Sequence, residues 1–359
     1  MTTTTHSTAA ATPWATVVRG VAFGDAWGNP NEFRSIRDLT RDEPCGPYLP
    51  KELEVTDDTQ MTLYLGDALD ASWDQPQDMV KREIIANYLT YRTDPDNNRA
   101  PGVTVMTSLG NLADGQRWQD ATSRYSDGSG TVMRTSPCAF LPKERWVGVT
   151  AFAAAVTHGT ANGIAAAILN VAVLRDILAG KVKAGGLLSR ARELCRDPAR
   201  AGLLDVGTWL EDFPVDLAEG FAELNRLIVR PLVALDRLQA DPWLQDYDPS
   251  LQIGTPLKGG GWRAHETLVI ALLAIDMIPD APWLALQRAV TTDGDSDTIG
   301  AVAGGLLGAL DPAVIQRAWN VYRTRFEPRY VRWIETEADH YAFAAPLRRG
   351  LAQRLLRRT

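Results

Sequence analysis

Apolar residues recur at three- and four-residue spacing along most of the chain, the pattern of amphipathic and buried α-helices. This spacing predicts helices over residues 14–26, 59–69, 78–91, 161–177, 217–234, 264–277, 298–310 and 314–325. We find no convincing period-two alternation of the kind that marks a half-buried strand. Gly, Pro, Asp and Asn gather between the helices, in residues 93–102, 127–137, 246–261 and 293–297. We therefore expect an all-α fold.

The same pattern predicts a single domain. No low-complexity linker and no repeat of solenoid length divides residues 13–359, and residues 1–12, mostly Thr and Ala, are typical of a flexible tail. Residues 181–214 are the least regular part, and we interpret them as a helical insertion or a lid. Residues 347–358 are Arg-rich and amphipathic, which favours a solvated helix end over a docking face, because cations suit the negative end of the helix dipole.

Composition narrows the classes of function. The 359 residues carry a formal net charge of −7, which gives no reason to expect binding to nucleic-acid phosphates. The three cysteines are scattered and lack metal-ligand spacing, which favours a reducing cytoplasm. Two apolar stretches, 147–174 and 299–310, are interpreted as buried helices, since the first contains His158 and Asn162 and the second is too short to cross a bilayer. We expect a cytoplasmic monomer that does not enter membranes.

Candidate chemistry lies in two acidic segments, Thr56-Asp57-Asp58-Thr59 and Asp295-Ser296-Asp297-Thr298, each of which opens a predicted helix. Helix N-capping needs only one such side chain. Adjacent carboxylates repel each other, and a cation relieves that repulsion. An all-oxygen ligand set selects Mg²⁺, Mn²⁺ or Ca²⁺ over Zn²⁺. If the segments meet in space, their four carboxylates can hold two divalent ions about 3.5–4 Å apart; simple capping of both helices is the alternative.

Glycines recur every four residues in the helix that follows the second acidic segment, at Gly300, Gly304 and Gly308. Each glycine costs roughly 1 kcal/mol relative to alanine inside a helix. Close approach of another helix is the compensation we expect, and it would hold Asp295 and Asp297 at the start of a rigid, buried helix.

Taken with further motifs, these segments resemble the ADP-ribosylglycohydrolase family, with the matches in the family's order. The matching motifs are Gly-Val-Ala-Phe-Gly-Asp-Ala-Trp-Gly at 20–28, then Glu32, 56–59, Asn-Arg-Ala-Pro-Gly-Val-Thr at 98–104, Gly-Ser-Gly-Thr-Val-Met-Arg at 128–134, Thr157-His158, Gly-Gly-Gly-Trp at 259–262 with Glu266, and 294–298. Together they cover residues 14–310, most of the chain.

The resemblance implies an orthogonal helical bundle around a central binuclear metal site, usually of two Mg²⁺ and sometimes of Mn²⁺. The metal ligands that it implies are Thr56, Asp57, Asp58, Asp295, Asp297 and Thr298. The implied reaction cleaves the glycosidic bond between the distal ribose of ADP-ribose and an acceptor. We hypothesise that the metals bind the ribose hydroxyls and orient a water, that Asp58 or Asp295 accepts its proton, and that Glu32 protonates the leaving group or gates the site.

Substrate contacts are expected from two glycine loops and their neighbours. The candidate residues are Gly102, Gly128, Ser129, Gly130, Met133, Arg134, His158, Gly259, Gly261 and Trp262. Glycine loops can offer backbone N–H groups to a diphosphate, although plain turns have the same composition. Arg134 could pair with a phosphate or with a buried carboxylate, and His158 could be a core residue. Trp262, or else Trp118, could stack on adenine or simply fill the core.

The acceptor stays open because this sequence departs from the family at substrate positions. Ser129 stands where Asn is usual, and Gly-Thr-Ala follows His158 in place of Asn-His-Pro. Protein arginine is favoured over serine, an ADP-ribosylated base or a metabolite. Two alternatives are an ADP-ribose-binding or toxin-blocking immunity protein of this fold, and a dimetal hydrolase of another class. The complete set of six implied ligands favours catalysis.

Overall fold

The computed structural model describes residues 12–243, 253, 260–337 and 341–344. Within these residues the chain is helical, and pairing between extended segments is limited to isolated β-bridges such as the one between Gly128 and Arg263. The predicted all-α class is confirmed. Residues 1–11 and 347–358 lie outside the described part, as do Gly259 and most of the loop 246–261.

All eight predicted helices are present, with ends shifted by a few residues. They are α1 (Pro13–Gly28), α3 (Asp57–Ser72), α4 (Gln77–Arg92), α8 (Ala161–Leu178), α10 (Leu217–Ala240), α12 (Ala264–Met277), α14 (Ser296–Leu310) and α15 (Pro312–Tyr322). The periodicity did not predict α2 (Ile36–Leu39), α5 (Val103–Ala113), α6 (Trp118–Ala121), α7 (Trp146–Ala155), α9 (Leu187–Arg196), α13 (Pro282–Ala289) or α16 (Pro328–Arg332). Thr12 caps α1, since its hydroxyl accepts a hydrogen bond from the Ala15 amide.

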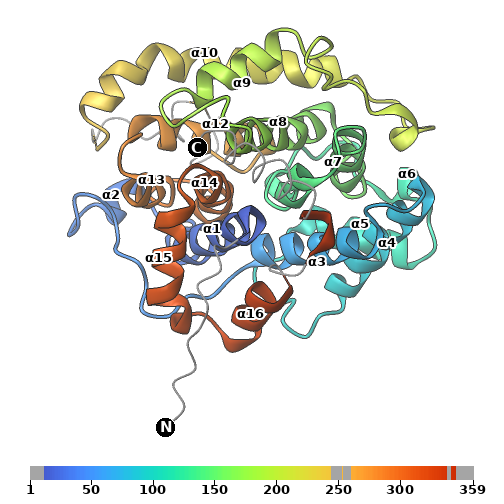
Figure 1. The fold of residues 1–359 in the computed structure, drawn as a ribbon, viewed down its shortest axis with the longest axis horizontal. Coiled ribbons are helices and arrows are strands. Elements are labelled where there is room, and N and C mark those ends of the chain that lie inside the picture. Colours follow the sequence, from blue (N-terminus) through green and yellow to red (C-terminus); the bar gives the residue numbers. More distant parts are fainter. Residues whose placement is uncertain (1–11, 244–252, 254–259, 338–340, 345–359) are drawn as a thin grey trace, which may run out of the picture.

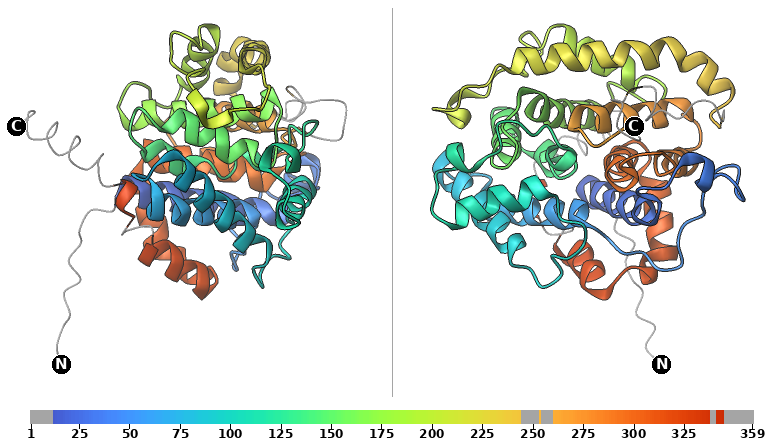
Figure 2. Two further views of the ribbon diagram at one scale, coloured as in Figure 1. Left: turned by 90° about the vertical axis from the view of Figure 1, so that its right-hand side faces the viewer. Right: turned by 180° about the vertical axis from the view of Figure 1, so that it is seen from behind.

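The apolar stretch 147–174 forms two buried helices, α7 and α8, with a break around Gly159. Thr160 caps the second helix by accepting a hydrogen bond from the Gly163 amide at 3.2 Å. α8 is long and apolar enough to cross a membrane, but 78% of it is buried inside the molecule, as is typical of a core helix. α10 packs across α8 and α12 along one edge (Figure 2).

Helices α1 and α14 lie side by side at the centre of the molecule (Figure 1). A Cβ atom added to Gly20 would lie 2.0 Å from the Gly304 carbonyl oxygen, and one added to Gly24 would lie 1.8 Å from that of Gly300. The expected close approach to the glycine stripe of α14 is thus present, and its partner is a second glycine stripe on α1. This backbone contact holds two adjoining parts in place: the second acidic segment, where α14 begins, and the turn that follows α1.

Residues 181–214 pack onto α7 as a fixed insertion. The Trp209 ring covers Gly148, where an added Cβ would lie 2.0 Å from the ring, and Phe213 covers Gly159 in the same way. The buried carboxylate of Asp276, in α12, accepts hydrogen bonds from backbone amides at the start of α9. Of the two interpretations of this segment, the contacts favour the insertion over the lid.

Candidate metal centre

The two acidic segments, distant in sequence, meet in the core. Thr56 caps α3 and Asp295 precedes α14. The hydroxyl of Thr298 donates to Asp58 Oδ2 at 3.3 Å, and the Thr56 hydroxyl lies at the same distance from that oxygen. The juxtaposition on which the metal hypothesis depends is therefore present in the structure.

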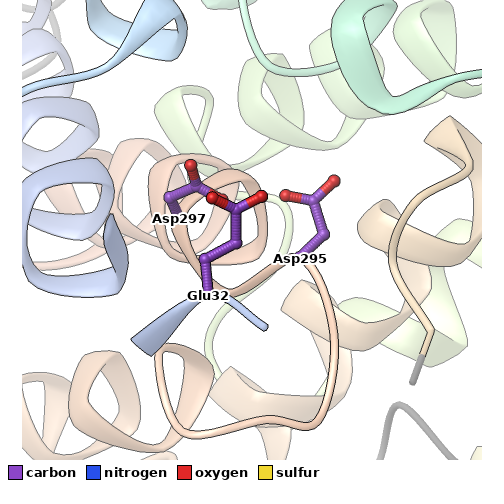
Figure 3. A group of neighbouring side chains, drawn as sticks. All are labelled: Glu32, Asp295 and Asp297. Carbon is purple, nitrogen blue, oxygen red and sulfur yellow. The ribbon is translucent and has the colours of Figure 1, made fainter. Parts of the chain in front are cut away.

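A second carboxylate group adjoins this meeting point. Ligand oxygens of Glu32, Asp295 and Asp297 all lie within 4.8 Å of one another (Figure 3). Glu32 reaches the group from the turn after α1, where its amide donates to the Gly28 carbonyl at 3.1 Å. Asp295 and Asp297 are buried, and Glu32 is partly exposed. Glu32, predicted as a catalytic residue, thus lies among the predicted metal ligands.

Asp25 is a further site residue, which the sequence indicated only as part of the motif 20–28. Its buried carboxylate lies in the last turn of α1 and accepts hydrogen bonds from the amide and hydroxyl of Thr56 and of Thr59. These bonds fix the first turn of α3 and so orient Asp57 and Asp58. An acidic residue inside the apolar run 21–27 is the signal that could have singled it out.

Burial and mutual repulsion dominate the electrostatics of the site. Desolvation, followed by the charge of Asp297, raises the pKa of Asp57 and of Asp58 well above the usual range. Desolvation also raises the pKa of Asp295 to about 6 and that of Glu32 to about 8. No ion pair found among the described residues gives these carboxylates a Lys or Arg partner. Repulsion between buried carboxylates of this kind strongly favours the binding of cations.

The donor set fits hard divalent cations. All candidate ligand atoms are oxygens, which suits Mg²⁺ or Mn²⁺. The Oδ1 atom of Asp58 is buried and has no hydrogen-bond partner among the residues that the structure describes. An unpartnered buried carboxylate oxygen is costly unless a ligand outside the protein compensates it. Thr56, Asp57, Asp58, Asp295, Asp297 and Thr298 are therefore suitably placed to hold such ions.

Three loops that were predicted to contact substrate surround the acidic group. The Gly102 amide donates to Asp57 Oδ2 at 3.2 Å. The Ser129 hydroxyl hydrogen-bonds Asp295, and the Ser129 amide donates to the Trp262 carbonyl at 3.0 Å, which joins the two glycine loops. Gly261 adopts a φ of +92°, a left-handed conformation in which a side chain would be strained.

Several amides of these loops already have partners within the protein. Those of Gly128 and Gly261 donate to Ser126 and Glu266 at 3.4 and 3.3 Å, in addition to the bond made by Ser129. These three N–H groups are thus less available to a diphosphate than the sequence suggested. The shape of the loops and the nearby carboxylates therefore define this part of the site more than free backbone N–H donors do.

Three of the predicted substrate residues lie beneath the first glycine loop. Arg134 is fully buried, donates to the Ala153 carbonyl and the Thr157 hydroxyl, and stacks on Tyr88. Met133 is also buried. These positions favour a supporting role for Arg134 and Met133 over direct contact with a phosphate, and a carboxylate partner for Arg134 is not found in the described residues.

His158 supports the same loop from below. Added Cβ atoms at Gly128 and Gly130 would lie 3.1 and 3.0 Å from its ring, so a side chain at either position would press tightly against the histidine. Desolvation lowers the pKa of His158 to about 3, and its Nδ1 hydrogen-bonds the Thr157 hydroxyl at 2.8 Å. It is a neutral, buried histidine.

The two tryptophans considered for adenine stacking have different surroundings. Trp118 packs against Phe152 and Phe213, with ring centroids 5.3 and 5.1 Å away, so it belongs to the core. Trp262 stacks on Phe33 at 5.1 Å beside the acidic group. Phe33 was not singled out from the sequence.

Comparisons with known proteins bear on the family of this chain. A search of curated protein sequences found no match. A solved structure described as an ADP-ribosylglycohydrolase-related protein complex is 22% identical, covers 92% of this chain and 98% of its own, and superposes with a TM-score of 0.55, which shows a shared fold. The model of the ADP-ribosylglycohydrolase family matches residues 15–354. This family hydrolyses glycosidic bonds of ADP-ribosylated substrates. The chain therefore belongs to the ADP-ribosylglycohydrolase family.

Proposed function

We propose that this protein releases ADP-ribose from arginine side chains of modified proteins with the help of two divalent cations, Mg²⁺ or Mn²⁺, and that it acts in the cytoplasm as a monomer. The observation that carries the proposal is the meeting of the segments 56–59 and 295–298 in a buried group of carboxylates that have no cationic partner among the described residues. Helix capping alone does not account for it, because Asp58 Oδ1 has no hydrogen-bond partner in the described part of the chain.

When bound, two such cations would supply positive charge that orients ribose hydroxyls and activates a water. The residues of the chain have distinct tasks around them. Asp25 fixes the first turn of α3, and Thr56 and Thr298 hold Asp58 from both sides. Ser129 orients Asp295 through its hydroxyl. A fixed arrangement of this kind lets charge on the sugar ring develop without reorganisation of the protein.

Proton transfer needs an acid and a base near the anomeric carbon. Glu32 lies at the partly exposed edge of the carboxylate group, so an acceptor that leaves toward solvent passes it. We assign it the protonation of the leaving group. Asp295 and Asp58 lie deeper, and one of them accepts the proton of the attacking water. The acid and base roles both follow from how deeply each carboxylate lies in the group.

The test is a hydrolysis panel on arginine-, serine- and base-linked ADP-ribose, each with Mg²⁺ and with a chelator. We expect release from arginine-linked substrate that depends on the metal. Asp295→Ala should abolish turnover and weaken metal binding. Asp311→Ala is a matched control, since Asp311 caps α15 by accepting from the Val314 amide and lies away from the acidic group.

Loss of that cap should lower stability by about 1 kcal/mol and leave turnover intact. Near-normal turnover by Asp295→Ala, or equal loss in both variants, would show that the acidic segments serve as helix caps. Tight substrate binding with no release on any linkage would favour the binding-protein alternative.

A further inference from the structure

An exposed aromatic pair borders the acidic group. The rings of Phe33 and Trp262 stack with centroids 5.1 Å apart and planes inclined by 22°. Phe33 is 75% exposed, whereas Trp262 is partly buried behind it. Trp262 thus supports Phe33 from behind, and the Phe33 ring is open to solvent. A large apolar side chain gains little stability from such a position.

The backbone of Phe33 is strained as well. Its φ of +63° lies in the left-handed region, which bulky residues rarely adopt. Hydrogen bonds on both sides impose this conformation: the Glu32 amide donates to Gly28 and the Arg34 amide donates to Asn31. The turn directs Glu32 into the carboxylate group and leaves the next ring outside. Strain that the surroundings enforce is found most often where a side chain has a function.

The location of the pair determines which part of a substrate it can reach. Phe33 directly follows Glu32, and Trp262 directly follows Gly261, whose missing Cβ would lie 3.4 Å from that of Asp295. If the distal ribose occupies the carboxylate group, adenine lies at the far end of the diphosphate. The negative face of an aromatic ring does not suit a diphosphate. The remaining group within reach is the acceptor.

We propose that Phe33, supported by Trp262, recognises the guanidinium group of an ADP-ribosylated arginine by stacking; this rests on the proposed function. A guanidinium is planar and cationic, and it stacks on aromatic faces. A serine linkage offers no flat face. A nucleobase does, but it brings phosphates toward a chain of net charge −7.

Four variants test this assignment. Phe33→Tyr keeps the ring, Phe33→Leu keeps the bulk without the ring, and Phe33→Ala removes both. Tyr48→Ala is the control, since Tyr48 is also a highly exposed aromatic residue, at 71%. We expect Phe33→Leu and Phe33→Ala to raise KM for arginine-linked ADP-ribose at least tenfold. Phe33→Tyr and Tyr48→Ala should match the wild type, as should the affinity of every variant for free ADP-ribose.

A second measurement separates this inference from the proposed function. Agmatine, a small guanidinium compound, should bind the wild-type protein in calorimetry and lose that binding in Phe33→Leu. If no linkage is cleaved but agmatine behaves in this way, the proposed function fails and the guanidinium site stands. The inference is overturned if Phe33→Leu leaves both agmatine binding and KM unchanged. It is also overturned if this variant raises KM equally for serine- and base-linked substrates, or if it weakens the binding of free ADP-ribose.

Discussion

Asp25 has no acidic neighbour in sequence, yet it organises the first acidic segment. Its carboxylate accepts hydrogen bonds from both the backbone and the side chains of Thr56 and Thr59. Burial raises the pKa of Asp25 to about 6 in spite of these bonds. Residues that orient the ligands of a metal are commonly as important to affinity as some of the ligands themselves.

We predict that Asp25→Asn weakens Mn²⁺ binding by roughly 10–100-fold, because the amide NH₂ would face N–H and O–H donors in place of accepting from them. Isothermal titration calorimetry measures this directly. Asp276→Asn is the control, since Asp276 is an equally buried carboxylate that accepts backbone hydrogen bonds at the start of α9. It should lower stability and leave Mn²⁺ affinity unchanged. Equal affinity in the two variants would remove Asp25 from the site.

A single residue could be assigned to the site from the sequence only where its neighbours along the chain marked it. Asp58 and Asp295 belong to runs of adjacent hydroxyls and carboxylates, which are visible in the sequence. Asp25 and Phe33 act through residues that only the fold brings opposite them. The burial of Arg134 beneath a loop is likewise a tertiary property, so its expected contact with a phosphate could not be judged from the motif.

At the scale of helices, the α1–α14 contact determines the geometry of the centre. Glycines on both helices let the two backbones touch, and a Cβ at Gly20 would overlap the Gly304 carbonyl. α1 leads directly into the turn that holds Glu32, and α14 begins within the segment 295–298. The sequence predicted the need for a close neighbour but not which helix it was.

We predict that Gly20→Ala destabilises the protein by about 3 kcal/mol, since overpacking against backbone leaves no flexible group to move aside. Gly110→Ala, in α5, is the matched control because an added Cβ there meets nothing within 4 Å. It should stabilise by roughly 0.5–1 kcal/mol. Urea unfolding midpoints report both changes. Similar midpoints for the two variants would contradict the close packing of α1 on α14.

The apolar stretch 147–174 was correctly predicted as buried and helical, but its division into α7 and α8 was not. Every residue of α7 is buried, so no polar face marks its period and its end could not be separated from α8. α2, α6 and α16 have only four or five residues, too few to show a helical period. The long amphipathic helices α4 and α10 were predicted well because one face of each is polar.

At the scale of the whole molecule, the fold concentrates negative charge in its interior. The pKa of Glu32 rises from 4.5 to about 8 through burial and the nearby Asp297 and Asp25. The folded state therefore holds this proton more tightly than the unfolded chain does. Without metal, stability should fall as pH rises from about 4.5 to about 8.

We predict that metal-free Glu32→Gln gains stability over the wild type as pH is raised across this window, because the amide cannot ionise. Subtraction of the two curves cancels the opposite contribution of buried histidines such as His158. Conversely, the rise in Tm that Mg²⁺ produces in the wild type should be larger at pH 8 than at pH 6, since protons compete with the cation. A difference between the variants that does not vary with pH would contradict this.

The most direct test of the central claim is anomalous diffraction from crystals soaked in Mn²⁺. Two peaks should appear between the segments 56–59 and 295–298, within coordination distance of Asp58 and Asp297 oxygens. Absence of density there at saturating Mn²⁺, or peaks only at surface carboxylates, would contradict the claim that the two segments form one metal centre.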